Sequence, residues 1–566
     1  MSSHNNPGSS NSNQTDPRQH PLMATVQAIA GAVQGEHRTP RMTHMMNANE
    51  GPADIISKVA GVTSGGKRSD DAPYFTTTKA SLGLMPPTAR PLQHFNRSKS
   101  LERMVHPCGS GAFGFFECTS DVSNLTKANF LQKVGEKTPV FVRFSTVILG
   151  REFPDEARNP RGFAIKFYTM EGNYDIVSLN FPIFFCRNPI QGPDVIKSQY
   201  RDPRNFFFDW ESTFDFLGNN AEGNHAGLMF FSDHGTPIGW RYNNGYGCHT
   251  FKWVNQAGEF VYIKYHFMGK HGTKRFTDAE AAGEEIEWTA YVQVMKPEDA
   301  DPEKLVFDPF DITKVWPRKL FPMQEFGRLV FNKNPEDYHR DVEQAAFSPG
   351  SMVPGIEDSP DPLLQFRMFF YRDAQYHRIG INLHQIPVNC PFMAMSYSSP
   401  NIGGTMRVDA NAAGNPQYVP SSFVSKFRND TAEAPYQTSD NICSRRSHFW
   451  HEGKKNDYDQ ARELYQRVMS EQEKANLATN TAKYLSQVRH KEIKLCFLAQ
   501  WHNIDPKLAE SDYTALRDEA KKDFTLEEVA TKSQDAELWN KAAKFRPAPG
   551  TKLQGAPCPA GMEYGA

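Results

Sequence analysis

The chain has 566 residues, with 63 basic and 65 acidic side chains and a formal net charge of −2. This balance gives no electrostatic reason to expect a nucleic acid or an anionic membrane surface as partner. No apolar run approaches the roughly 18 residues of a membrane span, and the eight cysteines include no C-x-x-C pair that would indicate a zinc site or a disulfide framework. The sequence therefore predicts a soluble protein with no membrane span, in reducing, intracellular surroundings.

Changes in composition divide the chain into five segments. Residues 1–70, rich in Ser, Asn, Gly, Gln and Pro, are predicted to be a disordered or arm-like extension, and 71–104 an N-terminal arm. Short aromatic and β-branched runs at 105–295 predict a β-barrel domain. Residues 296–450 are irregular and dotted with prolines, which predicts a wrapping segment. Residues 451–566 are predicted to form a C-terminal helical domain and tail.

The β-barrel domain is predicted to contain about eight antiparallel strands, because closure into a barrel leaves no exposed sheet edge. The turn at 255–258 joins two alternating runs as a hairpin. Strands are expected at 111–119, 138–147, 161–180, 181–188, 228–233, 247–267 and 285–295. Together with the helical tail, they predict an α+β protein.

Two helices are predicted near the start of the tail. Ser470 and Glu473 have the spacing of a capping box for the second of them. Apolar side chains at helical spacing mark the buried faces, which we interpret as core and not as cofactor contacts. The two stripes consist of Ala461, Leu464, Tyr465, Val468 and Met469, and of Leu477, Thr481, Tyr484, Leu485 and Val488.

Within the wrapping segment, residues 358–380 are predicted to form one helix. Asp358 and Ser359 are expected to cap it, Pro360 suits its first turn, and Gly380 is expected to end it.

One face of this helix carries Arg367, Tyr371 and Arg378, spaced four and then seven residues apart. A phenol flanked by cations can lose its proton below the usual tyrosine pKa, and a phenolate is a good ligand for ferric iron. The second arginine could hold an anionic group such as a haem propionate. The alternative is a buried tyrosine that hydrogen-bonds to a structural arginine, and this stretch alone leaves both interpretations open.

Four further residues could carry chemistry. His106 precedes a glycine-rich turn into the first strand, where glycine allows a close approach of the backbone. Arg143 and Ser145 share one face of a strand, and a buried arginine there needs an anion or a group of carbonyls. Asn180 lies in an apolar run, where its amide needs partners. Each signal alone also fits a structural role.

Taken together, these motifs resemble those of the haem catalases over about residues 103–392. ERMVHPCGSGAFGFFE resembles the distal-histidine motif of that family, and RMFFYRDAQYHRIG resembles its proximal-tyrosine motif. VRFSTV, NPRGFAIKFYTMEGNYDIV, IKSQYRDP, NGYGCHTFKWVN, FDITKVWP, VEQAAFSP and QIPVNCPF resemble further family signatures in family order. The helical tail resembles the C-terminal domain of the shorter-subunit catalases.

Position by position, the resemblance implies Tyr371 as the axial ligand of the iron in haem b and Arg367 as its hydrogen-bonding cation. It implies His106 as the distal acid–base residue, Asn180 as the amide that orients peroxide, and Ser145 as the hydrogen-bond partner of His106.

The resemblance also implies that Arg103, Arg143 and Arg378 hold the haem propionates. The implied fold is a β-barrel haem domain with a wrapping segment and a helical domain, and the implied assembly is a homotetramer. The implied function is the decomposition of hydrogen peroxide to water and dioxygen, which protects against oxidative stress. Two alternatives are a catalase-like haem oxidase or peroxidase with an organic substrate, and a catalase-fold protein with a structural or binding role.

Departures from the family pattern motivate the first alternative. The residues concerned are Phe181, Phe366, Arg372, where proline is usual, and Lys197, where histidine is usual.

The NADPH site of many shorter catalases is altered as well. His234, Met268 and Arg318 stand where Arg, Lys and His are usual, so binding of NADPH is left open. The chain ends in Glu563–Ala566 and not in the peroxisomal Ser-Lys-Leu signal, so both peroxisome and cytoplasm are expected locations.

Overall fold

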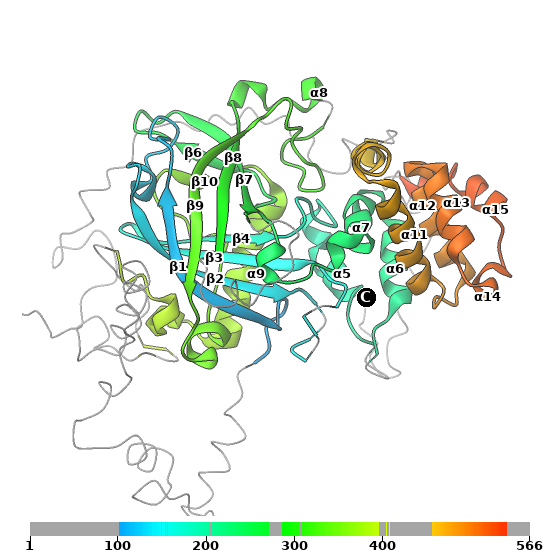
Figure 1. Cartoon of the computed structure of the whole chain (residues 1–566), viewed down its shortest axis with the longest axis horizontal. Helices are drawn as coiled ribbons and strands as arrows, with labels where there is room; N and C mark the ends of the chain where they lie inside the picture. Colours follow the sequence, from blue (N-terminus) through cyan, green and yellow to red (C-terminus); the bar gives the residue numbers. More distant parts are fainter. Residues whose placement is uncertain are drawn as a thin grey trace, which may run out of the picture. The chain divides into compact units, whose positions relative to one another are not determined.

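The computed structural model describes residues 101–148, 150–152, 154–155, 157–202, 207–270, 286–305, 307–394, 403–404, 407 and 456–539. The predicted extension at 1–70, most of the arm, and the end of the wrapping segment lie outside these residues, and the predicted domain limits stay predictions. Contacts along the chain define two compact units (Figure 1). We call them the barrel unit (Met1–Pro182, Pro237–Asp299 and Trp316–Ser439) and the helical unit (Ile183–Thr236, Ala300–Val315 and Asp440–Ala566).

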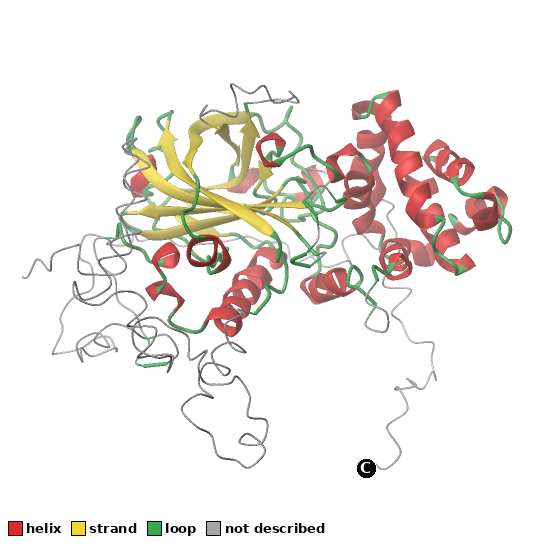
Figure 2. Cartoon of the chain, turned by 60° about the horizontal axis from the view of Figure 1, so that its bottom comes forward, coloured by secondary structure: helices red, strands yellow, loops and turns green. Residues whose placement is uncertain are grey.

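The barrel unit contains a closed antiparallel barrel of eight strands, which confirms the predicted fold class. The ring runs β1-β2-β3-β4-β5-β7-β8-β9 and closes by pairing of β9 with β1. In addition, β6 pairs with β7, and β10 pairs with β6. The strands are yellow in Figure 2. The strands are β1 (Gly109–Cys118), β2 (Lys137–Thr146), β3 (Arg161–Thr169), β4 (Gly172–Leu179), β5 (Gly245–Tyr246), β6 (Phe251–Val254), β7 (Phe260–Gly269), β8 (Ile286–Met295), β9 (Met323–Lys333) and β10 (Ile356–Asp358).

Alternate residues of most barrel strands form one aromatic-rich core. On β2 and β3 this inner face includes Phe144 and Phe163, whose ring centroids lie 5.1 Å apart. The intervening residues point outward, because successive side chains of a strand alternate between its faces. On the outer face a second cluster, which includes Phe141, Tyr168 and Val177, packs against Tyr371 of helix α9 (Pro362–Ile379). The outer face of β2, β3 and β4 is therefore the wall on which α9 lies.

Two of the predicted strands were wrong, and one long strand was missed. Residues 181–188 contain no strand, and 228–233 fall largely in α7 (Asn224–Phe231), where every residue is buried. A short apolar run that is buried on all sides has no periodicity with which to distinguish helix from strand. The segment predicted as irregular contains β9. Polar residues interrupt the apolar pattern of this strand, so the sequence gives little strand signal. Its pairing with β1 and β8 joins parts of the chain that are distant in sequence.

The proximal helix begins later than predicted. Helix α9 spans Pro362–Ile379, and its cap is Asp361, whose Oδ1 accepts hydrogen bonds from the backbone N–H groups of Leu363 (2.9 Å) and Leu364 (3.1 Å). Asp358 belongs instead to β10, so the predicted cap was wrong. The run Asp358–Pro362 holds two acidic residues, either of which could cap the helix, and two prolines. Only the pairing of β10 with β6, which places Asp358 in a strand, distinguishes the two candidate caps. Gly380 ends the helix as predicted, with φ 113°.

The helical unit is built around α12, nine of whose residues are buried. Ser470 and Glu473 form the predicted capping box at the start of α11, and the residues of the second stripe are buried except Tyr484, which is half-buried. Val468 is 71% exposed, so its place in the first stripe was wrong: 464–468 form a π-helical turn, which rotates it off the buried face. The helices are α5 (Gly192–Lys197), α6 (Trp210–Asn219), α7, α8 (Pro302–Leu305), α10 (Asp459–Glu463), α11 (Glu471–Leu485), α12 (Lys491–Ile504), α13 (Pro506–Ala515), α14 (Asp518–Lys521) and α15 (Leu526–Lys532).

Among the residues described, no helix has the length and apolar character that crossing a bilayer requires.

Candidate active site

The register of β2, β3 and β4 places the polar residues of the outer face in rows. Ser145 pairs with Gly162, which pairs with Leu179, and this row lies near one end of the strands. Arg143 lies two residues further along β2, on the same face. All eight residues predicted for the site belong to the barrel unit, and the structure brings them into three groups around this wall.

The first group centres on His106, which is half-buried and has φ 63°. Its backbone N–H donates to the Val147 carbonyl oxygen over 2.7 Å, and its Nδ1 lies 2.9 Å from Ser145 Oγ. The predicted pair is therefore in contact. With Nδ1 bonded to Ser145, Nε2 is the nitrogen with which His106 can exchange a proton with a substrate.

Gly162 makes this pairing possible and was missed by the sequence analysis. A Cβ atom at Gly162 would lie 2.5 Å from Ser145 Oγ and 2.6 Å from His106 Nδ1, closer than real Cβ atoms approach. The only signal in the sequence was a glycine at the start of a strand, which often marks a close approach of another group. Gly162 is therefore a space-making residue of the site.

His106 lies in a positively charged environment. Burial lowers its pKa to about 3, and the positive charges of Arg143, Arg367 and Arg103 lower it in the same direction. The imidazole is therefore neutral near pH 7 and can accept a proton.

Asn180, just beyond β4, is held by the first residue of β3. Its Oδ1 accepts a hydrogen bond from the Arg161 backbone N–H at 2.7 Å, and its own backbone N–H donates to the Arg161 carbonyl oxygen at 2.8 Å. The side chain is nearly fully buried. The amide is thus fixed in orientation, which is what a group that orients a substrate requires.

The second group is a chain of hydrogen bonds that ends at Tyr371. Arg367 Nη2 donates to the Tyr371 hydroxyl oxygen at 3.1 Å, with the guanidinium carbon 4.9 Å from the centre of the Tyr371 ring. Arg367 Nη1 lies 2.7 Å from His249 Nε2, and His249 Nδ1 lies 2.7 Å from Asp361 Oδ2. Burial lowers the pKa of His249, so the neutral ring accepts from Arg367 and donates to Asp361.

His249 and Asp361 were also missed by the sequence analysis. They lie 112 residues apart, and neither has a local pattern that indicates the pairing. Asp361 has two functions in the structure, since one carboxylate oxygen caps α9 and the other holds His249. The start of the helix and the position of Arg367 are therefore set by one side chain.

The third group contains Arg103, Arg143 and Arg378. Arg103 Nη2 donates to the carbonyl oxygens of Glu343 (2.6 Å) and Ala345 (3.0 Å), and Arg378 donates to the same two oxygens over 2.7 and 3.0 Å. Arg143 donates to the carbonyl oxygens of His106 (2.8 Å) and Pro107 (3.2 Å).

These arginines carry more positive charge than their surroundings balance. Burial lowers the pKa of Arg103 well below its usual value, and the charges of Arg143 and Arg378 lower it further. Burial likewise lowers the pKa of Arg378 to about 10. Glu343 is the carboxylate beside them, 3.4 Å from Arg103, and Arg151 shares it. Within the described residues the buried Nε of Arg143 has no acceptor. An anionic group with more than one acceptor, such as the carboxylates of a haem, fits this cluster.

The departures from the expected family pattern do not all lie at this site. Phe181 is buried, and its carbonyl oxygen accepts from Cys248 Sγ over 3.1 Å. Phe366 stacks on Phe370 along α9 with ring centroids 5.5 Å apart. Arg372 Nη2 donates to Ser351 Oγ at 3.0 Å. Lys197 is exposed in α5 of the helical unit.

The NADPH-position residues are divided between the units. His234 belongs to the helical unit, and Met268 and Arg318 belong to the barrel unit.

Comparisons with known proteins agree with the motifs. The catalase family model matches residues 87–425, and a model described as catalase-related immune-responsive matches residues 451–514. A catalase of Methanosarcina barkeri is 42% identical over 428 residues, which cover 71% of this chain and 83% of that protein. A peroxisomal catalase of Pichia angusta is 45% identical over 348 residues, 58% of this chain and 68% of its own. A crystal structure of a fungal catalase has a TM-score of 0.70 at 37% identity and covers 79% of this chain and 91% of its own.

Proposed function

The chain belongs to the catalase family and decomposes hydrogen peroxide to water and dioxygen, and on this premise we propose which of its residues carry out the reaction. The family implies haem as cofactor, and the alternatives of an organic substrate or a purely structural role are not favoured. The observation that carries our assignment is the hydrogen-bonded chain from Asp361 through His249 and Arg367 to Tyr371.

On the proximal side, we assign Tyr371 as the iron ligand. Arg367 donates to its oxygen and places a positive charge beside it, which suits an oxygen ligand that carries negative charge. His249 and Asp361 fix Arg367 from behind, so the guanidinium is positioned before the cofactor binds. The haem iron supplies the redox chemistry, and the protein supplies the ligand, the proton transfer and the orientation of the substrate.

On the distal side, we assign His106 as the group that moves the proton. The neutral Nε2 would accept a proton from one oxygen of the peroxide and return it to the other oxygen, which could then leave as water when the haem supplies the two electrons that cleave the O–O bond. Ser145 holds the ring through Nδ1 during both transfers. The amide of Asn180 presents a fixed dipole to the peroxide, because Arg161 holds its oxygen.

The cofactor is assigned as haem b, with its propionates held by Arg103, Arg143 and Arg378. Burial of these guanidiniums and the lack of an acceptor for Arg143 Nε among the described residues support this assignment. Burial and the charges of Arg143 and Arg378 lower the pKa of Arg103, and loading of the cofactor is expected to relieve the repulsion among these arginines.

Assembly, NADPH and location complete the proposal. A homotetramer is supported by the exposed apolar residues of α9, such as Phe369, which is 76% exposed in the single chain.

NADPH is an optional ligand, because His234, Met268 and Arg318 replace the residues that usually bind it in the family. We assign the protein to the peroxisome or the cytoplasm, and the relative named peroxisomal catalase supports the former.

The test uses the purified full chain loaded with haem. A visible spectrum of a ferric haem with an oxygen ligand, together with rapid release of dioxygen from hydrogen peroxide at an oxygen electrode, supports the proposal. Haem without dioxygen release contradicts the assignment of His106 and Asn180, and a chain that binds no haem contradicts the assignment of Tyr371.

A further inference from the structure

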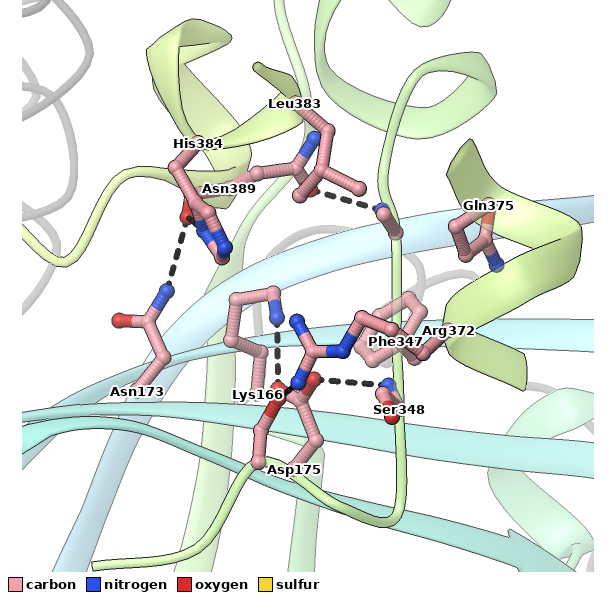
Figure 3. Close-up of a pocket in the computed structure, with 12 residues that line it drawn as sticks. Lys166, Asn173, Asp175, Phe347, Ser348, Arg372, Gln375, Leu383, His384 and Asn389 are labelled. Carbon is pink, nitrogen blue, oxygen red and sulfur yellow. Dashed lines mark hydrogen bonds and ion pairs between the residues drawn. The ribbon is translucent and has the colours of Figure 1, made fainter. Parts of the chain in front are cut away.

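A second polar site lies on the same outer face, further along the strands from Ser145. Lys166 of β3 and Asp175 of β4 are direct cross-strand partners, and they form the next outward-facing row after that of Arg143. Around them is a pocket of about 20 Å³, enough for one guest of the size of a water molecule (Figure 3). Its lining shares no residue with the active site.

The only carboxylate among the residues that line the pocket is already fully engaged. Asp175 Oδ1 lies 2.6 Å from Lys166 Nζ, and both side chains are almost completely buried. The other oxygen, Oδ2, accepts a hydrogen bond from the Ser348 backbone N–H at 3.0 Å. Asp175 therefore balances the charge of Lys166 and has little capacity to balance another cation.

Arg372 brings a second positive charge into the pocket. Its side chain comes from α9 and approaches Lys166 and Asp175, as Figure 3 shows, and Nη2 donates to Ser351 Oγ at 3.0 Å. Within the described part of the chain, no carboxylate lies at ion-pair distance from Arg372. Burial lowers the pKa of Lys166, Asp175 opposes this, and the charge of Arg372 lowers it further, so the two cations sense each other.

The remaining titratable residue of the lining adds no negative charge. Burial lowers the pKa of His384 to about 4, so its ring is neutral near pH 7. Among the described residues that line it, the pocket thus has two cations and one carboxylate, an excess of one positive charge. A partly buried excess charge is stabilised by a counter-ion, and the small volume excludes a peptide carboxylate or a nucleotide.

We propose that this pocket is a binding site for one small inorganic monoanion of the halide class, held between Arg372 and Lys166. The N–H donors of Arg372 and Lys166 that have no acceptor among the described residues contact the ion, and the Lys166–Asp175 pair keeps the second cation in place. Because Arg372 follows Tyr371 in α9, the bound ion neutralises a charge on the proximal side without entering the active site.

Bromide tests this directly, because it scatters anomalously and resembles chloride. Crystals of the holoenzyme are soaked in sodium bromide, and the thermal unfolding midpoint is measured in bromide and in gluconate at equal ionic strength. We expect an anomalous peak between Arg372 and Lys166 and a midpoint that rises with bromide but not with gluconate, an anion too large for the pocket.

Three variants locate the effect. Arg372→Gln removes the excess charge and is expected to abolish the anomalous peak and to weaken bromide binding at least about tenfold. Arg372→Lys keeps the positive charge and is expected to retain the peak and the binding. Arg328→Gln makes the same change in net charge at Arg328 of β9, which pairs with Glu117 away from the pocket, and is expected to behave as the parent does. No peak in the parent, or an equal peak in Arg372→Gln, overturns the proposal, as does equal loss in Arg328→Gln.

Discussion

The inner and outer faces of β2, β3 and β4 differ in what holds their side chains in place. Inner residues such as Phe144, Phe163 and Ile165 belong to one hydrophobic core. Outer residues such as Arg143 and Lys166 are also buried, yet each depends on a specific polar partner. Because an apolar contact tolerates small shifts and a buried hydrogen bond does not, the inner face sets the stability of the barrel and the outer face sets its chemistry.

The largest effect is expected where the outer face meets the cofactor. Tyr371→Phe removes the only atom of that side chain able to bind iron, so we expect the purified variant to retain little or no haem and to lose its activity. The ratio of haem absorbance to protein absorbance measures this loss. Tyr376→Phe, on the same helix, is the matched control. A Tyr371→Phe variant with full haem content and an unchanged spectrum would show that another residue ligates the iron.

His106→Ala separates chemistry from cofactor retention. This variant is expected to keep its haem and to lose about a hundredfold to ten-thousandfold in the rate of dioxygen release, because proton transfer by a positioned side chain contributes that much. An oxygen electrode measures the rate on protein of known haem content. His377→Ala, at an exposed position of α9, is the control. A loss below tenfold contradicts the role of His106.

Two adjacent residues of β3 test the difference between the faces directly. Phe163 points into the core, and Phe163→Ala is expected to lower the free energy of unfolding by about 3–5 kcal/mol while the folded enzyme keeps its activity. Gly162 points outward, and Gly162→Ala is expected to push His106 away from Ser145 and to reduce activity more than stability. Chemical denaturation and dioxygen release measure the two properties. The comparison fails if both variants lose both properties equally.

The smallest expected effect comes from a buried carboxylate of the helical unit. Asp512 of α13 is fully buried, neither carboxylate oxygen has a hydrogen-bond partner among the described residues, and burial raises its pKa well above the usual value. The pKa of Asp512 is therefore higher in the folded state than in the unfolded state. Above about pH 4 the unfolded state loses a proton that the folded state retains, so the free energy of unfolding falls as pH rises.

Asp512→Asn is therefore expected to raise the free energy of unfolding by about 1 kcal/mol at pH 7 and to flatten its fall between pH 4 and 7. Denaturation of both proteins across this range measures the effect. Asp518→Asn, whose side chain is 97% exposed, is the control. A variant less stable than the parent at pH 7 would indicate that the Asp512 carboxylate has a stabilising partner.

The parts of the site that are local in sequence were predictable. Arg367 and Tyr371 lie four residues apart, and helical geometry alone brings them together. The contact between His106 and Ser145 followed only from the resemblance, because 39 residues separate them. His249 and Gly162 were missed because each acts through a neighbour that the fold supplies. A glycine that makes space and a histidine that braces an arginine have no pattern of their own.

The fold shows the same division between local and distant information. Capping at Ser470 and the end of α9 at Gly380 depend on a few adjacent residues and were predicted correctly. Strand β9 was missed because its partners, β1 and β8, are the features that define it.

Closure of the barrel has a consequence for the order in which the enzyme assembles. Each of β2, β3 and β4 is paired on both sides, so none can leave the ring without breaking two ladders. Helix α9 is tethered through the three-residue strand β10 and the cap at Asp361, and most of its side chains remain half-buried. In a hydrogen-exchange experiment, we expect the backbone amides of β2, β3 and β4 to be among the slowest to exchange, and those of α9 to exchange first. Local opening of α9 would then allow the cofactor to bind against β2, β3 and β4 while these strands remain folded.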